Sequence, residues 1–322
     1  MRFERRGIVL VPSDLSLAEW PELAARAGLN TIALHPTPDP VIDFVRSTDG
    51  QAALARVAEL GLDIEYELHA MAHLLPRALF PDHPHLFRMN EAGERVPDAN
   101  LCQSSEEGLE RVAEHAEAVS RILRPTTHRY FLWPDDGAPW CQCPLCRDLT
   151  PSDQSTVVAN RIAAALRQDD ADARVAWLAY ANTMAPPRNV RPAPELFLEW
   201  APIERDSGRP LDDPGCEQNA RLLAALDKLL EVFPADTAQV LEYWMDASRF
   251  CGWRRPAVRI PFDAQVLRAD LAALAARGIT SATSFGVWLD ADYVRMHGMF
   301  PIDEYGAALS AEYPGPPAGR TP

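Results

Sequence analysis

Short apolar runs alternate with amphipathic segments along almost the whole chain, and this alternation limits the possible folds most. The apolar runs have the length of strands, and we predict eight strands, at 6–12, 30–36, 63–68, 130–133, 174–180, 195–200, 238–244 and 280–288. The segments with helical spacing lie at 15–28, 41–60, 105–123, 154–168, 219–233, 262–278 and 302–313. Strands that alternate with helices pair in parallel through right-handed crossovers. The sequence therefore predicts an α/β protein, a single (β/α)8 TIM barrel over residues 1–313.

Two parts of the pattern are irregular. No clear helix separates residue 180 from residue 195, so a doubly wound open sheet is the alternative, although no G-x-G-x-x-G loop supports it. Long loops follow the third strand, at 69–104, and the fourth strand. Loops of this length in a compact domain usually serve a function. The C-terminal residues 314–322, PGPPAGRTP, are expected to be a disordered tail.

The charge of the chain excludes some partners. The formal net charge is −15 and no basic run interrupts it, which argues against nucleic acid and anionic membranes. No stretch approaches the roughly 20 apolar residues of a transmembrane helix. The apolar run at 7–11 is too short for the core of a signal peptide. We therefore expect a cytoplasmic protein, and the sequence does not indicate its oligomeric state.

In a barrel of this kind, active-site residues come from the carboxyl ends of the strands. Those ends carry mostly carboxylates, histidines and aromatic residues: His35, Glu67, His69, Asp135, Asp136, Tyr180, Asn182, Trp200, Glu204, Glu242, Trp244, Asp246, Trp288 and Asp290. Carboxylates perform general acid–base catalysis, and aromatic rings stack on the apolar face of a sugar. No phosphate-binding loop and no nucleophile elbow accompany them. The pattern points to a carbohydrate ligand bound by His35, Glu67, His69, Tyr180, Trp200, Trp244 and Trp288.

Two adjacent carboxylates, Asp135 and Asp136, follow the fourth strand, which Pro134 should end because proline has no N–H to donate. Like charges held this close raise the pKa of one of them, which suits a general acid. The pair could instead form a turn and a helix cap. Glu242 is a second candidate partner for Asp136, as nucleophile or base on a separate strand.

Three cysteines follow in a C-x-C-x-x-C pattern, at Cys141, Cys143 and Cys146. In a reducing compartment such a cluster is typical of a metal site, and structural zinc takes four ligands. Cys102 is the best fourth ligand, because it ends the loop of the neighbouring strand. Cys216, Cys251 and His69 are weaker candidates, and free thiols are the alternative. A closed four-thiolate site would be structural, and the pattern leaves zinc or iron open.

Five segments carry a resemblance to a known family: FPDHPHLFRMNEAGERVPDANLCQSS, WPDDGAPWCQCPLCRDL, SDQSTVVANRIAAAL, LAYANTMAPP and RPLDDPGCEQN. Over about residues 65–290, the chain resembles an uncharacterised bacterial family of glycoside-hydrolase-like barrels. That family is described as alpha-glucuronidase-like or as related to the family 20 and family 84 hexosaminidases. The resemblance implies that Cys102, Cys141, Cys143 and Cys146 belong together. It also implies that Asp136 is the general acid, with Asp135 as the partner that orients a substrate acetamide or raises the pKa of Asp136.

We therefore expect a glycoside hydrolase that acts on a small or terminal sugar, an N-acetylhexosaminide or a hexuronide. One alternative is a sugar-binding barrel without activity. Another is a divalent-metal sugar isomerase or epimerase that uses Glu67, His69, Glu204 and Glu242 as ligands. The sequence does not indicate the sugar, its anomer, or whether hydrolysis retains or inverts configuration.

Overall fold

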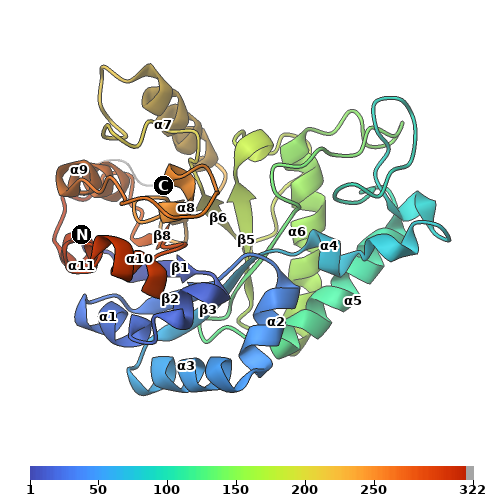
Figure 1. Cartoon of the computed structure of the whole chain (residues 1–322). Helices are drawn as coiled ribbons and strands as arrows, with labels where there is room; N and C mark the ends of the chain where they lie inside the picture. Colours follow the sequence, from blue (N-terminus) through green and yellow to red (C-terminus); the bar gives the residue numbers. More distant parts are fainter. Residues whose placement is uncertain (317–322) are drawn as a thin grey trace.

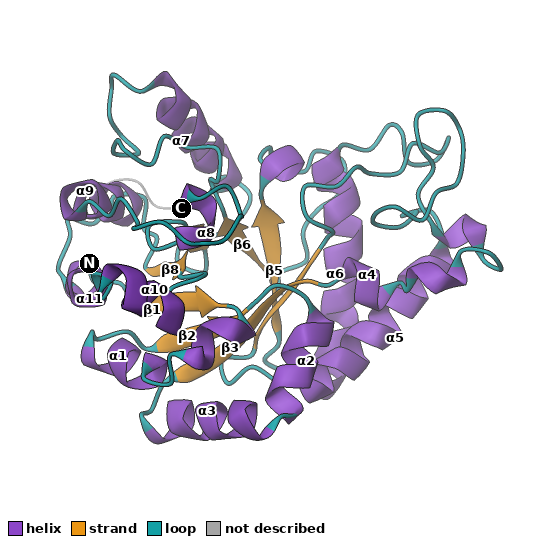
Figure 2. Ribbon diagram, in the orientation of Figure 1, coloured by secondary structure: helices purple, strands orange, loops and turns teal. Residues whose placement is uncertain are grey.

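The computed structural model describes residues 1–316, and its strands form one closed parallel barrel (Figure 2). The strands pair in chain order, and β8 closes the barrel against β1. They are β1 (Arg5–Leu10), β2 (Thr31–Leu34), β3 (Asp63–His69), β4 (Arg129–Trp133), β5 (Arg174–Ala179), β6 (Leu196–Trp200), β7 (Gln239–Glu242) and β8 (Ser281–Phe285). This confirms the predicted (β/α)8 barrel and excludes the doubly wound sheet. Residues 317–322 of the predicted tail lie outside the described part.

The helices surround this barrel (Figure 1). They are α1 (Trp20–Arg26), α2 (Pro38–Arg46), α3 (Thr48–Glu59), α4 (Met71–Leu74), α5 (Glu106–Ile122), α6 (Pro151–Asp169), α7 (Glu217–Leu229), α8 (Ala247–Phe250), α9 (Ala264–Ala275), α10 (Ala291–His297) and α11 (Ile302–Ser310). Between β5 and β6 there is only a short 3-10 turn, Ala181–Thr183, as the absence of a helical pattern indicated. Within residues 1–316, every helix is too short or too polar to cross a bilayer.

One predicted helix, at 41–60, is in fact two. The chain is extended at Ser47, whose hydroxyl accepts a hydrogen bond from the backbone N–H of Gly50 and caps α3. An N-cap residue has non-helical dihedrals, so α2 must end before α3 begins. The apolar spacing continues across the break, which is why the periodicity alone did not reveal it.

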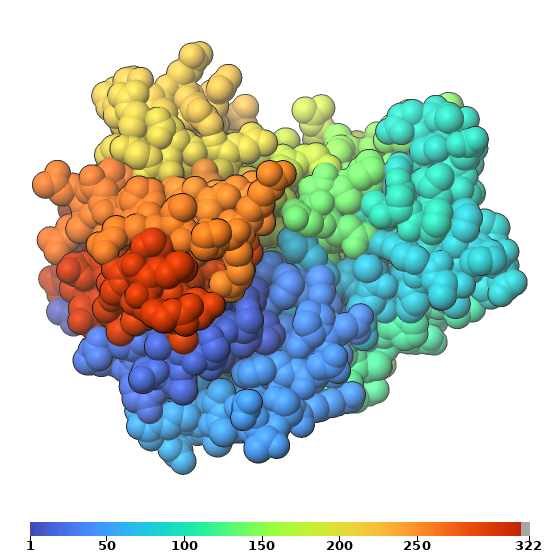
Figure 3. Space-filling model, viewed as in Figure 1, coloured from blue at the N-terminus to red at the C-terminus, as the bar shows by residue number. Residues whose placement is uncertain are grey.

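The loops after β3 and β4 lie together at one side of the barrel. The β3 loop contains α4, the 3-10 turns Arg77–Leu79 and Pro84–Leu86, and a small antiparallel bridge between Met89 and Arg95. Its cyan residues project at the right of the molecule (Figure 3). Cysteine side chains from both loops meet in one buried cluster. The two segments that the sequence marked as long loops are therefore one connected structure.

Side chains on the strands alternate between the barrel interior and the helix layer. On β7, Gln239 points inward and donates to Glu67 on β3 and to Glu199 on β6. Glu242, three positions later, faces outward and pairs with Arg205. Leu241 and Tyr243, the residues before and after Glu242, belong to the interior cluster. This register decides which strand-end residues can reach a ligand at the mouth.

A buried polar layer lies inside the barrel beneath its mouth. Glu67 and Glu199 are fully buried there, and Arg129 donates to the side chain of Gln239 that joins them. Burial raises the pKa of Glu199 to about 8, and burial together with the charge of Glu199 raises the pKa of Glu67 well above its usual range. The indole N–H of Trp133 donates to Glu199 at 2.9 Å and connects this layer to the mouth.

Candidate functional site

A cavity of about 280 Å³ opens at the carboxyl ends of the strands. Its lining comes from all eight strand ends: Val11, His35, Pro36, His69, Trp133, Asp136, Leu178, Tyr180, Ala201, Ile203, Leu241, Tyr243, Asp246, Ser248, Trp253, Phe285, Val287 and Trp288. The structure thus brings together five residues proposed from the sequence, His35, His69, Asp136, Tyr180 and Trp288. The other five, Glu67, Asp135, Trp200, Glu242 and Trp244, are absent from this lining.

The two histidines present the same ring nitrogen to the cavity. Nδ1 of His35 lies 2.8 Å from the carbonyl oxygen of Glu67, and Nδ1 of His69 lies 2.8 Å from that of Pro134. A carbonyl oxygen only accepts, so Nδ1 carries the hydrogen in both rings and Nε2 of the neutral ring is an acceptor. Burial, and after it the nearby His69, lowers the pKa of His35 to about 3, so His35 is neutral.

The two adjacent aspartates occupy different environments. The side chain of Asp135 is 18% exposed, pairs with Arg77, and accepts the backbone N–H of Asn100 at 2.6 Å. The side chain of Asp136 is 67% exposed, and its Oδ1 lies 3.9 Å from Nε2 of His69. Asp135 is therefore bound into the junction of the two long loops, whereas Asp136 is available to a ligand. The Asp135–Asp136 pair does not present two carboxylates to one cavity.

Tyr180 lies beside Asp136 at the end of β5. Burial, and after it the charge of Asp136, raises the pKa of the Tyr180 phenol, so this group stays protonated. A protonated phenol can donate to a carboxylate. Asp136 thus has a hydrogen-bond donor on the β5 side and an imidazole on the β3 side.

A second carboxylate in the cavity comes from Asp246, to which the sequence analysis gave no role beyond its position near the end of the seventh strand. Its side chain caps α8, and Oδ1 accepts from the backbone and the hydroxyl of Ser248 at 2.9 and 2.6 Å. Asp246 is 3% exposed, and burial raises its pKa despite these donors. Because it is already buried and held in place, this carboxylate is positioned before a ligand arrives.

Aromatic residues form much of the wall. Tyr243 and Phe285 contact each other with ring centroids 5.2 Å apart, and Trp253 is 61% exposed at the rim. The sequence analysis did not select these three residues. Tyr243 was hidden because its neighbours Glu242 and Trp244 are as suited to a strand end as Tyr243 is. Trp253 lies in a loop that carries no strand or helix pattern.

Trp288, which lines the cavity after β8, has a backbone in the left-handed region. Its φ is +67°, and its N–H donates to Oδ1 of Asp14 at 2.9 Å. Asp14 is fully buried, accepts a second N–H from Val11, and has a pKa raised to about 8 by burial. The guanidinium of Arg255 lies 4.8 Å from the Trp288 ring centroid. These contacts fix the Trp288 ring before a ligand binds.

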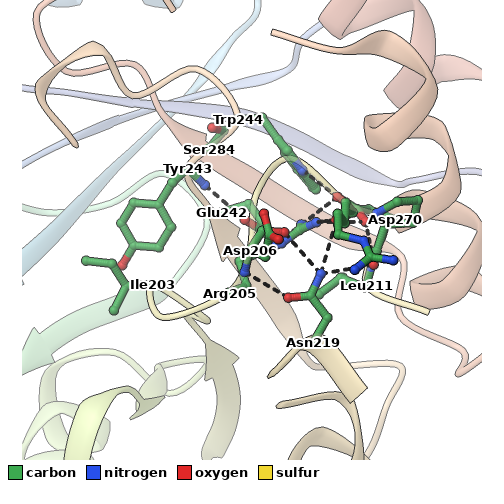
Figure 4. A network of polar contacts seen from close by, with 12 residues as sticks. Ile203, Arg205, Asp206, Leu211, Asn219, Glu242, Tyr243, Trp244, Asp270 and Ser284 are labelled. Atoms are coloured by element: carbon green, nitrogen blue, oxygen red, sulfur yellow. Dashed lines mark hydrogen bonds and ion pairs between the residues drawn. The ribbon is translucent and has the colours of Figure 1, made fainter. Parts of the chain in front are cut away.

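Glu242 belongs to β7, but its side chain points away from the barrel interior into the polar network that Figure 4 shows. Its Oε1 accepts from Arg205 at 2.8 Å, and Arg205 also binds Asp270 of α9. The indole of Trp244 donates to Asp270 at 2.9 Å, so Trp244 also faces the helix layer. Trp200 is fully buried among the residues between strands and helices. Glu67 points inward but lies in the polar layer beneath the cavity.

The four cysteines proposed as ligands converge in one buried cluster. Their sulfur atoms all lie within 4.8 Å of one another, with Cys102 at 3.7 Å from Cys143 and 3.9 Å from Cys146. Tetrahedral zinc at about 2.3 Å from each sulfur requires sulfur atoms about 3.8 Å apart. The backbone N–H of Met89 donates to Cys141, and the Ser104 hydroxyl lies 3.1 Å from Cys102. These four thiols could hold a metal; Cys216 and Cys251 are not part of the cluster.

Comparisons with known proteins agree with this architecture. A family model described as a domain of unknown function, DUF4838, matches residues 10–249. A search of curated proteins found no match. The structure is similar to the cold-adapted β-galactosidase from Rahnella sp. R3, with a TM-score of 0.56 and 13% identity over 96% of this chain, which spans 56% of that protein.

Two further solved structures have a similar barrel. One is a GH20 catalytic module of the pneumococcal exo-β-D-N-acetylglucosaminidase, with a TM-score of 0.50, 8% identity, and coverage of 96% of this chain and 84% of that one. The other is an endo-β-1,4-glucanase from Xanthomonas axonopodis pv. citri, with a TM-score of 0.50, 10% identity, and coverage of 95% and 98%. At such identities the likeness shows the fold alone. The family match and these neighbours confirm the resemblance to an uncharacterised family of glycoside-hydrolase-like barrels.

Proposed function

The chain belongs to the DUF4838 family, and we propose that it is a glycoside hydrolase that acts on a small or terminal sugar in the cavity at the barrel mouth. The proposal depends on one observation: two carboxylates, Asp136 and Asp246, line the same aromatic-lined cavity. Glycosidases need two carboxyl groups that flank the scissile bond. The aromatic walls would stack on the sugar ring, and the substrate would be an N-acetylhexosaminide or a hexuronide.

We assign Asp136 as the general acid. Its carboxyl is exposed to the cavity, and it lies between the Tyr180 phenol and Nε2 of His69. Proton transfer requires such access to the glycosidic oxygen. Asp135 would support Asp136 indirectly. The contacts of Asp135 with Arg77 and Asn100 hold in place the loop that carries Asp136.

We assign the role of the second carboxylate to Asp246. Glu242 was the other candidate for this role, but its charge is balanced by Arg205 on the helix side of the wall. Asp246 lies four residues further along the chain and returns to the cavity because it begins α8. It would act as base or nucleophile from the β7 side.

Substitution of Asp136 tests the assignment. General acid catalysis contributes about 10²–10⁴-fold, so Asp136→Asn should lower kcat on a chromogenic glycoside by at least about 10²-fold with folding intact. Asp148→Asn is the matched control, because Asp148 lies in the same loop but is exposed away from the cavity lining. Full activity of Asp136→Asn would contradict the assignment. A wild type that hydrolyses no glycoside in a broad panel would favour the sugar-binding alternative.

We also propose that the four-cysteine cluster holds one structural zinc. The sulfur spacing fits a tetrahedral ion, and four thiolates would leave no open position for a substrate. Elemental analysis of purified protein should give about one zinc per chain. Cys143→Ser should lose the zinc and lower the thermal midpoint, whereas Cys216→Ser, a buried cysteine outside the cluster, should keep the zinc. Protein with neither zinc nor iron would contradict a metal site.

A further inference from the structure

The cavity presents hydrogen-bond acceptors from four side chains, and its donors are the neutral hydroxyl and indole groups of its tyrosines, serine and tryptophans. Nε2 of His35 and Nε2 of His69 accept when the rings are neutral, because both Nδ1 atoms donate to carbonyl oxygens. The carboxylates of Asp136 and Asp246 also accept. A ligand that satisfies such a cavity must bring O–H or N–H donors. Sugar hydroxyl, amide and ammonium groups do so, and a carboxylate does not.

The cavity also lacks a cation to bind an acid group. Among the described residues 1–316, no lysine or arginine lines it. Two guanidinium groups that lie against lining aromatic rings are already engaged by other partners. Arg255 binds Asp290 at 2.7 Å, and Arg249 donates to the carbonyl of Ile203 at 2.6 Å while its charge lies 5.3 Å from the Tyr243 ring centroid. Carboxylates in protein sites are bound by arginine, lysine or convergent N–H groups.

The charge balance within the cavity points the same way. Arg249 lies near Asp246 and offsets its charge, since its backbone N–H also donates to that carboxylate. Among the described residues, Asp136 has no guanidinium or ammonium partner, and its ion-pair contact is with His69, whose Nε2 lies 3.9 Å from Oδ1. An anionic sugar would therefore meet an unbalanced negative charge together with acceptor nitrogens.

From this lining we infer that the cavity binds uncharged or amino sugars and rejects hexuronides. The inference rests on the proposed function for its location, and it narrows the substrate class from the two that the sequence left open. His35 offers its Nε2 as an acceptor at any pH between 5 and 8, because its ring remains neutral throughout that range. Discrimination against the acid group is then built into the cavity rather than supplied by a remote residue.

Binding of matched methyl glycosides tests the inference separately from hydrolysis. We would titrate the full chain with methyl β-glucoside, N-acetylglucosaminide, glucosaminide and glucuronide and measure Kd by ligand-observed NMR or calorimetry. The glucuronide should bind at least about tenfold more weakly than the N-acetylglucosaminide. The glucosaminide should bind at least as well as the neutral sugars. Equal or tighter binding of the glucuronide overturns the inference, and so does a failure of all four to bind.

Two variants check the cause. Asp136→Asn removes the unbalanced charge and should narrow the difference between glucuronide and neutral sugar. Ile203→Lys places an ammonium group at a half-buried position of the lining and should strengthen binding of the glucuronide relative to the neutral sugars. No change of the ratio in either variant would also overturn the inference. Hydrolysis tests the proposed function, and binding tests this inference. A wild type that hydrolyses nothing therefore refutes the proposed function, whereas the ratio of the Kd values still decides the inference.

Discussion

Replacement of Arg205 by methionine should destabilise the fold strongly, because Arg205 is the only counter-ion that the described residues offer to two buried carboxylates (Figure 4). Arg205 is 2% exposed, and its Nη1 lies 2.8 Å from Glu242 and 2.5 Å from Asp270. The three side chains come from the loop after β6, the end of β7 and helix α9. The pair of interactions therefore links the barrel wall to its outer layer.

The size of the effect follows from which charges remain. Removal of one partner of a buried ion pair costs about 3–5 kcal/mol, because the other charge is left uncompensated. Asp270 keeps two donors, the N–H of Leu211 at 2.7 Å and the indole of Trp244. Burial already raises its pKa to about 6. We expect the loss in unfolding free energy to lie near the lower end, at about 3 kcal/mol at pH 8.

The sign of the pH dependence is fixed by the same carboxyl. The pKa of Asp270 is higher in the folded protein than in the unfolded chain, so the folded state binds more protons between these two values. Without Arg205 this pKa rises further, so the variant gains stability relative to wild type as the pH falls. The deficit of Arg205→Met should therefore be smaller at pH 5.5 than at pH 8.

Urea unfolding at both pH values measures this difference. Arg26→Met is the control, because Arg26 pairs with Asp303 at the surface, where their side chains are 56% and 64% exposed. Such surface pairs contribute about 0–1 kcal/mol. The reasoning is refuted if Arg205→Met costs no more than the control, or if its deficit grows on acidification.

Two other buried carboxyls give further predictions. The folded pKa of Glu199 is raised to about 8, so the wild type loses stability as the pH rises from about 4.5 toward 8. Glu199→Gln should remove that slope, at most about 1.4 kcal/mol per pH unit, and a pH-independent difference in unfolding free energy between the two proteins would contradict it. Asn at position 14 in Asp14→Asn offers one acceptor oxygen to the two N–H groups of Val11 and Trp288. The variant should therefore lose about 1–3 kcal/mol of unfolding free energy, measured with urea. It should also bind sugar more weakly, because the Trp288 ring is less well held. Unchanged stability and affinity would show that Asp14 does not hold this ring.

The barrel and the cysteine cluster were accessible from the sequence because both depend on order along the chain. Alternating strand and helix lengths identify the barrel, and neighbouring strands in the chain become neighbours in the sheet. Cys102 ends the loop after β3, and the C-x-C-x-x-C motif lies in the loop after β4. The ends of adjacent strands lie side by side, so topology alone could propose that the four cysteines meet.

The face of each strand was not accessible in the same way. The sequence placed Glu242 and Trp244 near a strand end, which is correct, but the interior side chains there are Leu241 and Tyr243. In an amphipathic strand, polar and apolar residues alternate and reveal the register. A parallel barrel strand is buried on both faces, so the run VLEYW carries no such alternation. The pairing of Glu242 with Arg205 depends on a loop contact that no local pattern records.

The same reasoning explains why the adjacent aspartates divide their roles. Asp135 and Asp136 lie in the turn that follows β4, where the chain changes direction between them, so their side chains need not enter the same cavity. Here Asp135 turns toward Arg77 and Asn100, whose positions depend on the fold of the β3 loop, and Asp136 turns toward the mouth. A second carboxylate for the cavity must then come from another strand end. Asp246 meets that requirement because α8 begins there and directs its side chain back into the lining.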